Sequence, residues 1–209
     1  MKALNYFKLD IRIMKKSIKG LLLFPIISIV MFSNNNKSMA FGYLFLFLVI
    51  FAVMPFTIAS NEKTDRMYYL FPTKISSIVL GRYIFLVCGM AVIWICSSLM
   101  MAYYYSHDVI SMSLIKNNIL IGLITSIICF IQYPIYYKYG VVKGKIVSML
   151  IYMIPGFLVF GLSGLMEEKG YEFAINNNMY YSIIGILITI LIAYISYLIS
   201  CSICRKKEI

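Results

Sequence analysis

Residues 83–107 read YIFLVCGMAVIWICSSLMMAYYYSH, a run that contains no Asp, Glu, Lys or Arg. A helix needs about 20 consecutive apolar residues to cross a bilayer, so this stretch is long enough to span a membrane. Other charge-free stretches occur along the chain, at residues 20–36, 38–61, 117–137, 146–166 and 173–204. The sequence therefore predicts an all-α integral membrane protein.

We expect six transmembrane helices, at about residues 18–33, 39–60, 83–105, 118–137, 146–166 and 180–203. The first is short, because its apolar part is followed by the polar residues 33–36. It can still span the bilayer if it begins near Ser17 and Lys19 extends toward the headgroups. Alternatively, the N-terminal region is a signal peptide cleaved near Ala40, so retention of the first span stays open.

Composition and charge distribution support this class of protein. The chain is 62% hydrophobic and 13% charged, whereas soluble domains are about 45–50% apolar and about 25% charged. Of its 19 Lys and Arg residues, sixteen lie in the N-terminal segment, in 61–82, in a predicted loop at 138–145 and in the C-terminal tail. The positive-inside rule then places both termini in the cytoplasm (N-in/C-in). The net charge of +11 reflects this topology, and we expect no binding of nucleic acid.

Residues 1–17 are predicted to form an amphipathic helix on the cytoplasmic leaflet, ahead of a six-helix transmembrane domain at 18–209. One face of this helix is apolar and another is basic, which suits an anionic lipid surface. These faces comprise Leu4, Phe7, Ile11, Met14 and Ile18, and Lys8, Arg12, Lys15 and Lys19. The helix is either a plain topology anchor or an element that transmits motion along the membrane plane.

The predicted spans contain no ionisable side chain at depth, which argues against a proton- or sodium-coupled carrier. Their polar side chains are more typical of hydrogen bonds between helices than of ligand binding. These residues are Ser97, Ser98, Thr125, Ser126, Gln132, Thr189 and Ser196.

Catalytic and metal-binding motifs are absent from the sequence. The Cys201-x-x-Cys204 pair lacks nearby partners for a zinc site. Glu167-Glu168 resembles the acidic pair of intramembrane prenyl endopeptidases, but Tyr171 stands where those enzymes carry Arg, and no His follows. No phosphate-binding loop is present. We therefore expect no catalytic residue, no metal and no cofactor in this chain.

The predicted loop at residues 61–76 reads NEKTDRMYYLFPTKIS. Its first part is charged, and its apolar tetrad at 68–71 is followed by a turn at Pro72. An exposed apolar patch rimmed by charge usually marks a contact with a partner or with the membrane.

This loop and the start of the next span resemble the membrane subunits of bacterial type-2 ABC exporters, in their small six-span group. The matching residues are Glu62, Asp65, Leu70, Pro72, Thr73, Lys74, Ile78, Val79, Arg82 and Tyr83, with Phe71 inserted between Leu70 and Pro72. The resemblance implies that 61–76 is a coupling helix in a groove of a separate ATPase. In this interpretation Tyr68, Tyr69, Leu70 and Phe71 fill the groove, Glu62, Asp65 and Arg66 rim it, and Pro72, Thr73 and Lys74 follow at its end.

The resemblance further implies a permease subunit in the cell (plasma) membrane, with ATP and Mg bound only by the partner ATPase. A second permease subunit, identical or different, would complete the transport path. The expected cargo is an amphipathic peptide or lipid-like molecule, since the chain is similar to phenol-soluble modulin exporter permeases. The alternatives are a non-transporting membrane partner, such as a sensor or immunity subunit, and an intramembrane enzyme.

Overall fold

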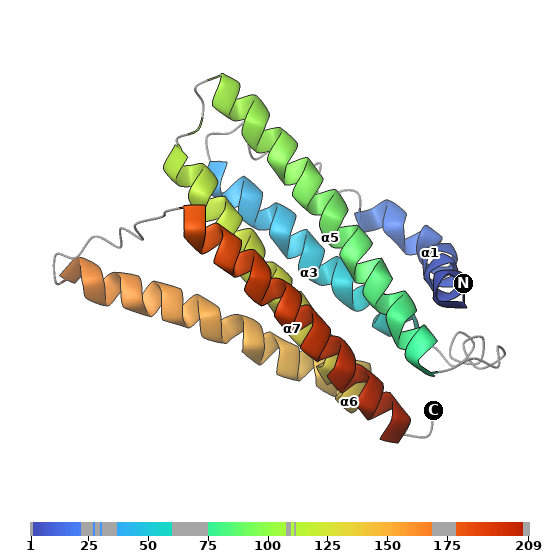
Figure 1. The fold of residues 1–209 in the computed structure, drawn as a ribbon. Coiled ribbons are helices and arrows are strands. Elements are labelled where there is room, and N and C mark those ends of the chain that lie inside the picture. The colour runs from blue at the N-terminus through green and yellow to red at the C-terminus, as the bar shows by residue number, and fades with distance from the viewer. Residues whose placement is uncertain are drawn as a thin grey trace.

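A computed structural model describes residues 2–21, 27, 30, 37–59, 75–107, 110, 112–168 and 179–206. These residues form long helices, and no strand occurs among them, which confirms the all-α class. The helices are α1 (Lys2–Leu21), α3 (Lys37–Ala59), α5 (Ile75–Ser106), α6 (Met112–Glu168) and α7 (Met179–Lys206) (Figure 1).

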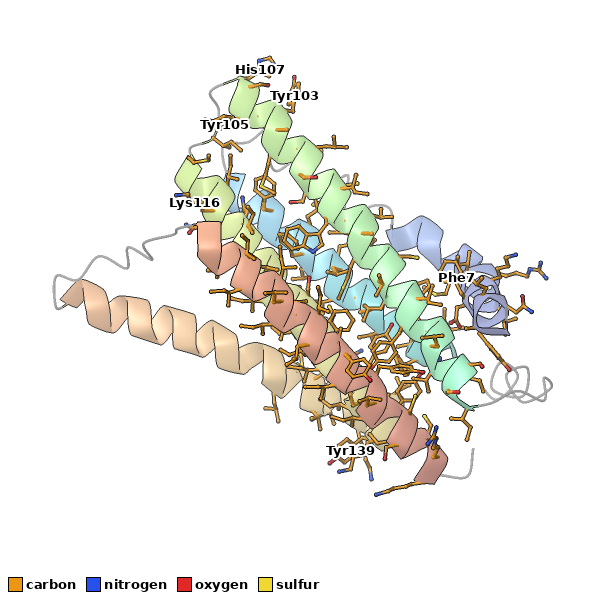
Figure 2. The ribbon with its side chains drawn as sticks, in the orientation of Figure 1. Phe7, Tyr103, Tyr105, His107, Lys116 and Tyr139 are labelled. Carbon is orange, nitrogen blue, oxygen red and sulfur yellow. The ribbon has the colours of Figure 1, made fainter. Side chains whose placement is uncertain are left out.

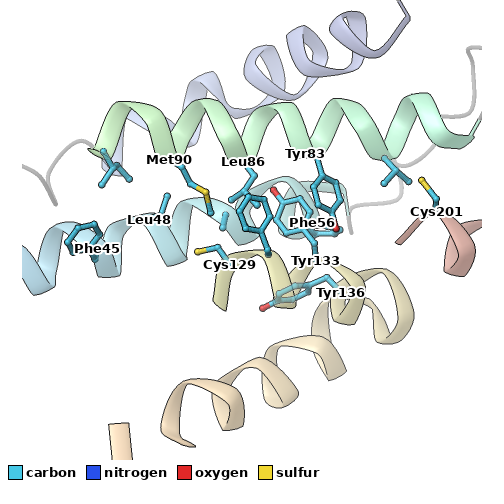
Figure 3. Close-up of a cluster of buried hydrophobic side chains, with 14 of the residues drawn as sticks. Phe45, Leu48, Phe56, Tyr83, Leu86, Met90, Cys129, Tyr133, Tyr136 and Cys201 are labelled. Atoms are coloured by element: carbon cyan, nitrogen blue, oxygen red, sulfur yellow. The ribbon is translucent and has the colours of Figure 1, made fainter. Parts of the chain in front are cut away.

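The helices form a bundle in which α3 packs against α5 and α6, and α7 packs against α6 and α5. Helix α1 lies across the outside of this bundle, against α5 and α3 (Figure 1). Buried side chains from α3, α5 and α6 meet in the centre, among them Leu48, Leu86, Cys129 and Tyr133 (Figure 3). The core is therefore shared by helices that are far apart in the sequence.

Three described stretches are long and apolar enough to cross a membrane: Ile75–Ser106, Ile115–Leu150 and Ile183–Lys206. They contain the spans predicted at 83–105 and 118–137 and residues 183–203 of the span predicted at 180–203, so the chain is a multi-pass membrane protein. Helix α3 covers residues 39–59 of the span predicted at 39–60 and contains a shorter apolar part, Leu44–Ile58. The span predicted at 18–33 lies largely outside the described residues. The count of six spans stays a prediction.

The loop predicted at 138–145 is instead a helix reversal at a single residue. Gly140 has φ 74° and ψ −175°, whereas residues on both of its sides are helical. Figure 1 shows residues 141–168 turning back from this point and spreading away from α7. One residue is enough because glycine adopts a positive φ at little cost, so no longer loop is needed.

The ends of the bundle differ in charge. At one end, called the Gly140 end, α3 and α7 end, α5 begins and α6 reverses (Figure 1). Exposed basic side chains at this end are Lys138, Lys143, Lys145, Arg205 and Lys206. Figure 2 shows Lys116 at the opposite end, beside Tyr103, Tyr105 and His107. This distribution matches the charge asymmetry behind the predicted N-in orientation, which itself stays a prediction.

Helix α1 has three faces rather than the two predicted. Tyr6, Asp10 and Met14, spaced four residues apart, are buried, and Asp10 is only 1% exposed. Leu4 and Ile11, which belong to the predicted apolar face, are 51% and 40% exposed. The bundle thus covers the neighbouring side of the helix and leaves the Leu4 and Ile11 side to the surroundings. The basic residues Lys8 and Arg12 are also exposed.

Helix α1 docks closely on α5 at Gly81. A Cβ atom at Gly81 would lie 2.7 Å from Tyr6 Cβ and 2.9 Å from the carbonyl oxygen of Ala3. The rings of Phe7 and Phe85 meet beside this contact, with their centroids 6.4 Å apart. Because these neighbours are backbone or next to backbone, only a residue without a side chain permits this approach.

We expect Gly81→Ala to lower the free energy of unfolding by about 1–3 kcal/mol, since the added methyl group pushes α1 away from α5. Unfolding of the purified protein by sodium dodecyl sulfate, followed by circular dichroism, measures this loss. Gly42→Ala on α3 is the matched control, because in the described structure no atom outside the neighbouring turns of its own helix lies within 4 Å of its Cβ position. That control should be neutral or stabilising by up to about 1 kcal/mol. Equal stability of the two variants would contradict the docking described.

Candidate functional site

The coupling residues predicted from the sequence lie outside the described residues. They are Glu62, Asp65, Arg66, Tyr68, Tyr69, Leu70, Phe71, Pro72, Thr73 and Lys74. The structure does describe how the flanking helices enter the bundle, because α3 ends at Ala59 and α5 begins at Ile75. The candidate site therefore consists of these two helix ends and the residues that contact them.

Tyr83 lies less than three turns into α5, and its hydroxyl joins α5 to α7. It lies 2.6 Å from Ser196 Oγ and 2.9 Å from Ser200 Oγ. Ser196 Oγ in turn donates to the carbonyl oxygen of Phe130 on α6, at 2.6 Å. Ser196 and Ser200 share one face of α7 because they are four residues apart.

The direction of these bonds follows from the proton count, since each hydroxyl donates only one hydrogen. Ser196 uses its proton for the Phe130 carbonyl, so Tyr83 must donate to Ser196. Tyr83 can then only accept from Ser200. The result is a single chain of hydrogen bonds, from Ser200 through Tyr83 and Ser196 to Phe130, that connects α5, α6 and α7.

An aromatic layer from α3 and α6 packs beside Tyr83 (Figure 3). Phe56, near the end of α3, lies 5.0 Å from Tyr133, 5.3 Å from Tyr136 and 5.0 Å from Tyr137 between ring centroids. Tyr83 continues the layer, with its ring 5.0 Å from that of Tyr133. Aromatic pairs at these separations add stability beyond the area they bury. The last turns of α3 are thus fixed to α6 and, through Tyr133, to α5.

Arg82 is 9% exposed and sits inside this aromatic layer. Its guanidinium carbon lies 4.8 Å from the ring centroid of Phe56 and 5.6 Å from that of Tyr137. Such cation–π contacts are worth about 2 kcal/mol or more when desolvated. The carbonyl of Arg82 also accepts a long hydrogen bond from Tyr133, at 3.4 Å. A charge beside the membrane is therefore held by ring faces from α3 and α6.

Helix α1 contributes a buried charge of opposite sign. Asp10 and Arg82 both act electrostatically on Tyr133. A buried charge is tolerated only where other charges or polar groups compensate its loss of water. The end of α3 and the start of α5 therefore belong to a cluster to which all five described helices contribute.

Most of this cluster could not be predicted from the sequence. Arg82 and Tyr83 belong to the motif but had no predicted role, and Asp10 was not among the predicted site residues. The signal for Tyr83 was the spacing of Ser196 and Ser200, which places two hydroxyls on one face of an apolar helix. The burial of Asp10 and Arg82 depends on neighbours that are distant in the sequence, so no local pattern indicates it.

The polar residues of the predicted spans behave in three ways. Ser126 and Ser196 bond to other helices, as expected, because Trp94 Nε1 donates to Ser126 at 3.2 Å and Ser196 joins Tyr83 and Phe130. Others bond to carbonyls of their own helix, namely Ser98, Thr125 and Thr189. Ser97 and Gln132 have no hydrogen-bond partner in the described structure.

The arrangement connects the described helices mechanically. Within the described residues, no group of three His, Cys, Asp or Glu side chains is placed to hold a metal ion. None of the five cysteines forms a disulfide. What the cluster can do is pass a displacement of the α3 end or the α5 start to α6, α7 and α1.

Comparison with known proteins gives one match. A sequence model of a family described as ABC-2 family transporter protein matches residues 5–205. No curated protein and no solved structure matches the chain.

We expect Tyr83→Phe to lower the free energy of unfolding by about 1 kcal/mol, because Ser200 loses its acceptor inside the bundle. Detergent unfolding of purified protein measures the change. Tyr103→Phe, at an exposed ring, should change stability by less than about 0.5 kcal/mol.

A double-mutant cycle with Ser200→Ala tests the hydrogen-bond chain itself. The two substitutions remove the same bond, so their effects should be clearly less than additive. Additive effects would mean that the two hydroxyls do not interact.

Proposed function

Because the chain belongs to the ABC-2 family of transporter proteins, we propose that it is the permease subunit of an ATP-driven exporter. The observation that carries this proposal is the extent of the family match, which runs from α1 to the last turn of α7. The match therefore includes the loop at 61–76 and the whole cluster at the Gly140 end.

In the proposed mechanism, residues 61–76 are a cytoplasmic coupling helix that binds a groove of a separate ATPase. The apolar tetrad Tyr68–Phe71 fills the groove, and Glu62, Asp65 and Arg66 rim it. Burial of aromatic and aliphatic anchors supplies most of the binding energy at such interfaces, whereas exposed rim charges contribute little. ATP and Mg are bound by the ATPase alone.

The structure supports this mechanism through what the loop is attached to. The last turns of α3 carry Phe56 and the first turns of α5 carry Arg82 and Tyr83, all in the cluster at the Gly140 end. A movement imposed on the loop would act on these turns first. Packed interiors move as units rather than deforming gradually, so the displacement would reach α6 and α7 through Tyr83 and Ser196.

The proposed cargo is an amphipathic peptide or a lipid-like molecule. The described spans expose aliphatic side chains over most of α7 and along α5, where an apolar cargo or a second permease subunit could contact them. An amphipathic cargo also suits a bundle whose described buried charges, Asp10 and Arg82, both belong to the cluster at the Gly140 end. A homodimer or heterodimer of permeases would complete the path.

We expect Leu70→Ala and Glu62→Ala to reduce export while leaving the folded protein intact, because both change only the contact with the ATPase. Loss of the apolar anchor at Leu70 should weaken ATPase binding at least about tenfold, more than loss of the rim charge at Glu62. Co-purification with the partner ATPase measures the binding, and export of a labelled amphipathic peptide from vesicles measures the transport.

Glu167→Ala is the matched control, since it removes a carboxylate at the end of α6 that is far from Gly140 in sequence. It should bind the ATPase and export normally. Normal export by both loop variants would contradict the coupling role. ATPase binding without any export in the unmodified protein would favour a sensor or immunity subunit.

A further inference from the structure

Gln132 is a polar residue within the span predicted at 118–137, and its side chain is 0% exposed. Neither its amide oxygen nor its amide nitrogen has a hydrogen-bond partner in the part of the chain that the structure describes. Asn118 lies earlier on the same helix and is 1% exposed. Its amide nitrogen also has no hydrogen-bond partner in the described structure. These are two amide side chains on α6 for which the fold supplies no complete set of partners.

Asn118, Thr125 and Gln132 are spaced seven residues apart. In a straight helix, positions seven apart drift by only about 20° around the axis, so the three lie in one stripe along α6. The stripe extends over about 21 Å at the helical rise of 1.5 Å per residue, most of the hydrocarbon thickness of about 30 Å. Thr125 donates to the carbonyl of Ile121 at 2.8 Å, which leaves its oxygen able to accept.

A purely structural role does not account for these amides. Polar side chains retained inside membrane bundles normally bond to a neighbouring helix, as Ser126 and Ser196 do here. A buried amide without a partner destabilises the fold by about 1–3 kcal/mol per group. An apolar side chain of similar size at Gln132 would avoid that cost, so packing alone gives no reason for glutamine.

We propose that Asn118, Thr125 and Gln132 line the polar side of the path through which the cargo crosses the membrane. This inference rests on the proposed function and names the surface that the cargo contacts. The ligand is the polar face of an amphipathic peptide, whose amide and hydroxyl groups both donate to and accept from side-chain amides. The stripe supplies these bonds along the span and carries no charge that would hold the cargo in place.

The first test is cysteine accessibility in vesicles that contain the complete transporter with its ATPase. Single cysteines are placed at 125 and 132 in a chain whose native cysteines are replaced by alanine, and a positively charged methanethiosulfonate reagent is added. Asn118 is less decisive, because it lies near the start of α6. The matched controls are Ile124→Cys and Ile131→Cys, which precede the stripe residues and are exposed on the outside of the bundle.

We expect Thr125→Cys and Gln132→Cys to react on the order of a hundredfold faster than the two controls, because a charged reagent is excluded from lipid. Equal reactivity of stripe and control positions in a transporter that exports cargo would overturn the inference. If residues 125 and 132 react faster than the controls but the chain binds no ATPase, the result would support the path and contradict the proposed role of the ATPase.

The second test uses Gln132→Leu in the otherwise unmodified chain, and so does not depend on the cysteine-free background. If Gln132 lines the path, the variant should unfold at the same temperature as the unmodified protein or a higher one, and it should export at least tenfold more slowly with unchanged ATPase binding. If Gln132 instead stabilises the fold, the variant should unfold at a lower temperature, and that result would overturn the proposal. Ile131→Leu is the control for changing side-chain shape at this level of α6.

Discussion

The structure depends on one constraint, which is that a polar group in hydrocarbon has no water to bond to and must find its partner within the protein. At the Gly140 end this constraint is met by the hydroxyl chain of Ser200, Tyr83 and Ser196 and by the ring faces around Arg82. The same groups that satisfy one another also hold α3, α5, α6 and α7 in fixed relation. The contacts that satisfy these polar groups are therefore the same contacts that connect the helices mechanically.

The membrane class and the approximate position of the helices could be predicted from the sequence, because long charge-free runs are a property of the chain itself. A connection near residue 140 could be predicted, but not that a single residue makes the reversal in α6. Lysines at 138 and 143 suggest an exposed loop, but the turn is made by the positive φ of Gly140 alone. The face of α1 that the bundle covers could not be predicted, because the close approach at Gly81 between distant segments selects the face with Tyr6 and Asp10.

The candidate site likewise has one part that could be predicted from the sequence and one part that could not. A sequence motif identified the loop at 61–76, because charged, aromatic and proline residues in that order are a local pattern. The cluster that receives the loop is not local, since Tyr83 meets Ser196 and Arg82 meets Phe56 across different helices. Residue type alone did not separate Ser196, which binds across helices, from Gln132, which has no partner in the described structure.

The reversal at Gly140 also constrains how the chain can change in length. Ordinary connections absorb insertions, because extra residues extend into solvent without moving the elements they join. Here one added residue would turn the following helix by about 100° about its own axis and present a different side of it to the rest of the bundle. The number of residues between Tyr136 and Ser148, whose hydroxyls lie 3.0 Å apart across the reversal, is therefore fixed as strictly as any single side chain.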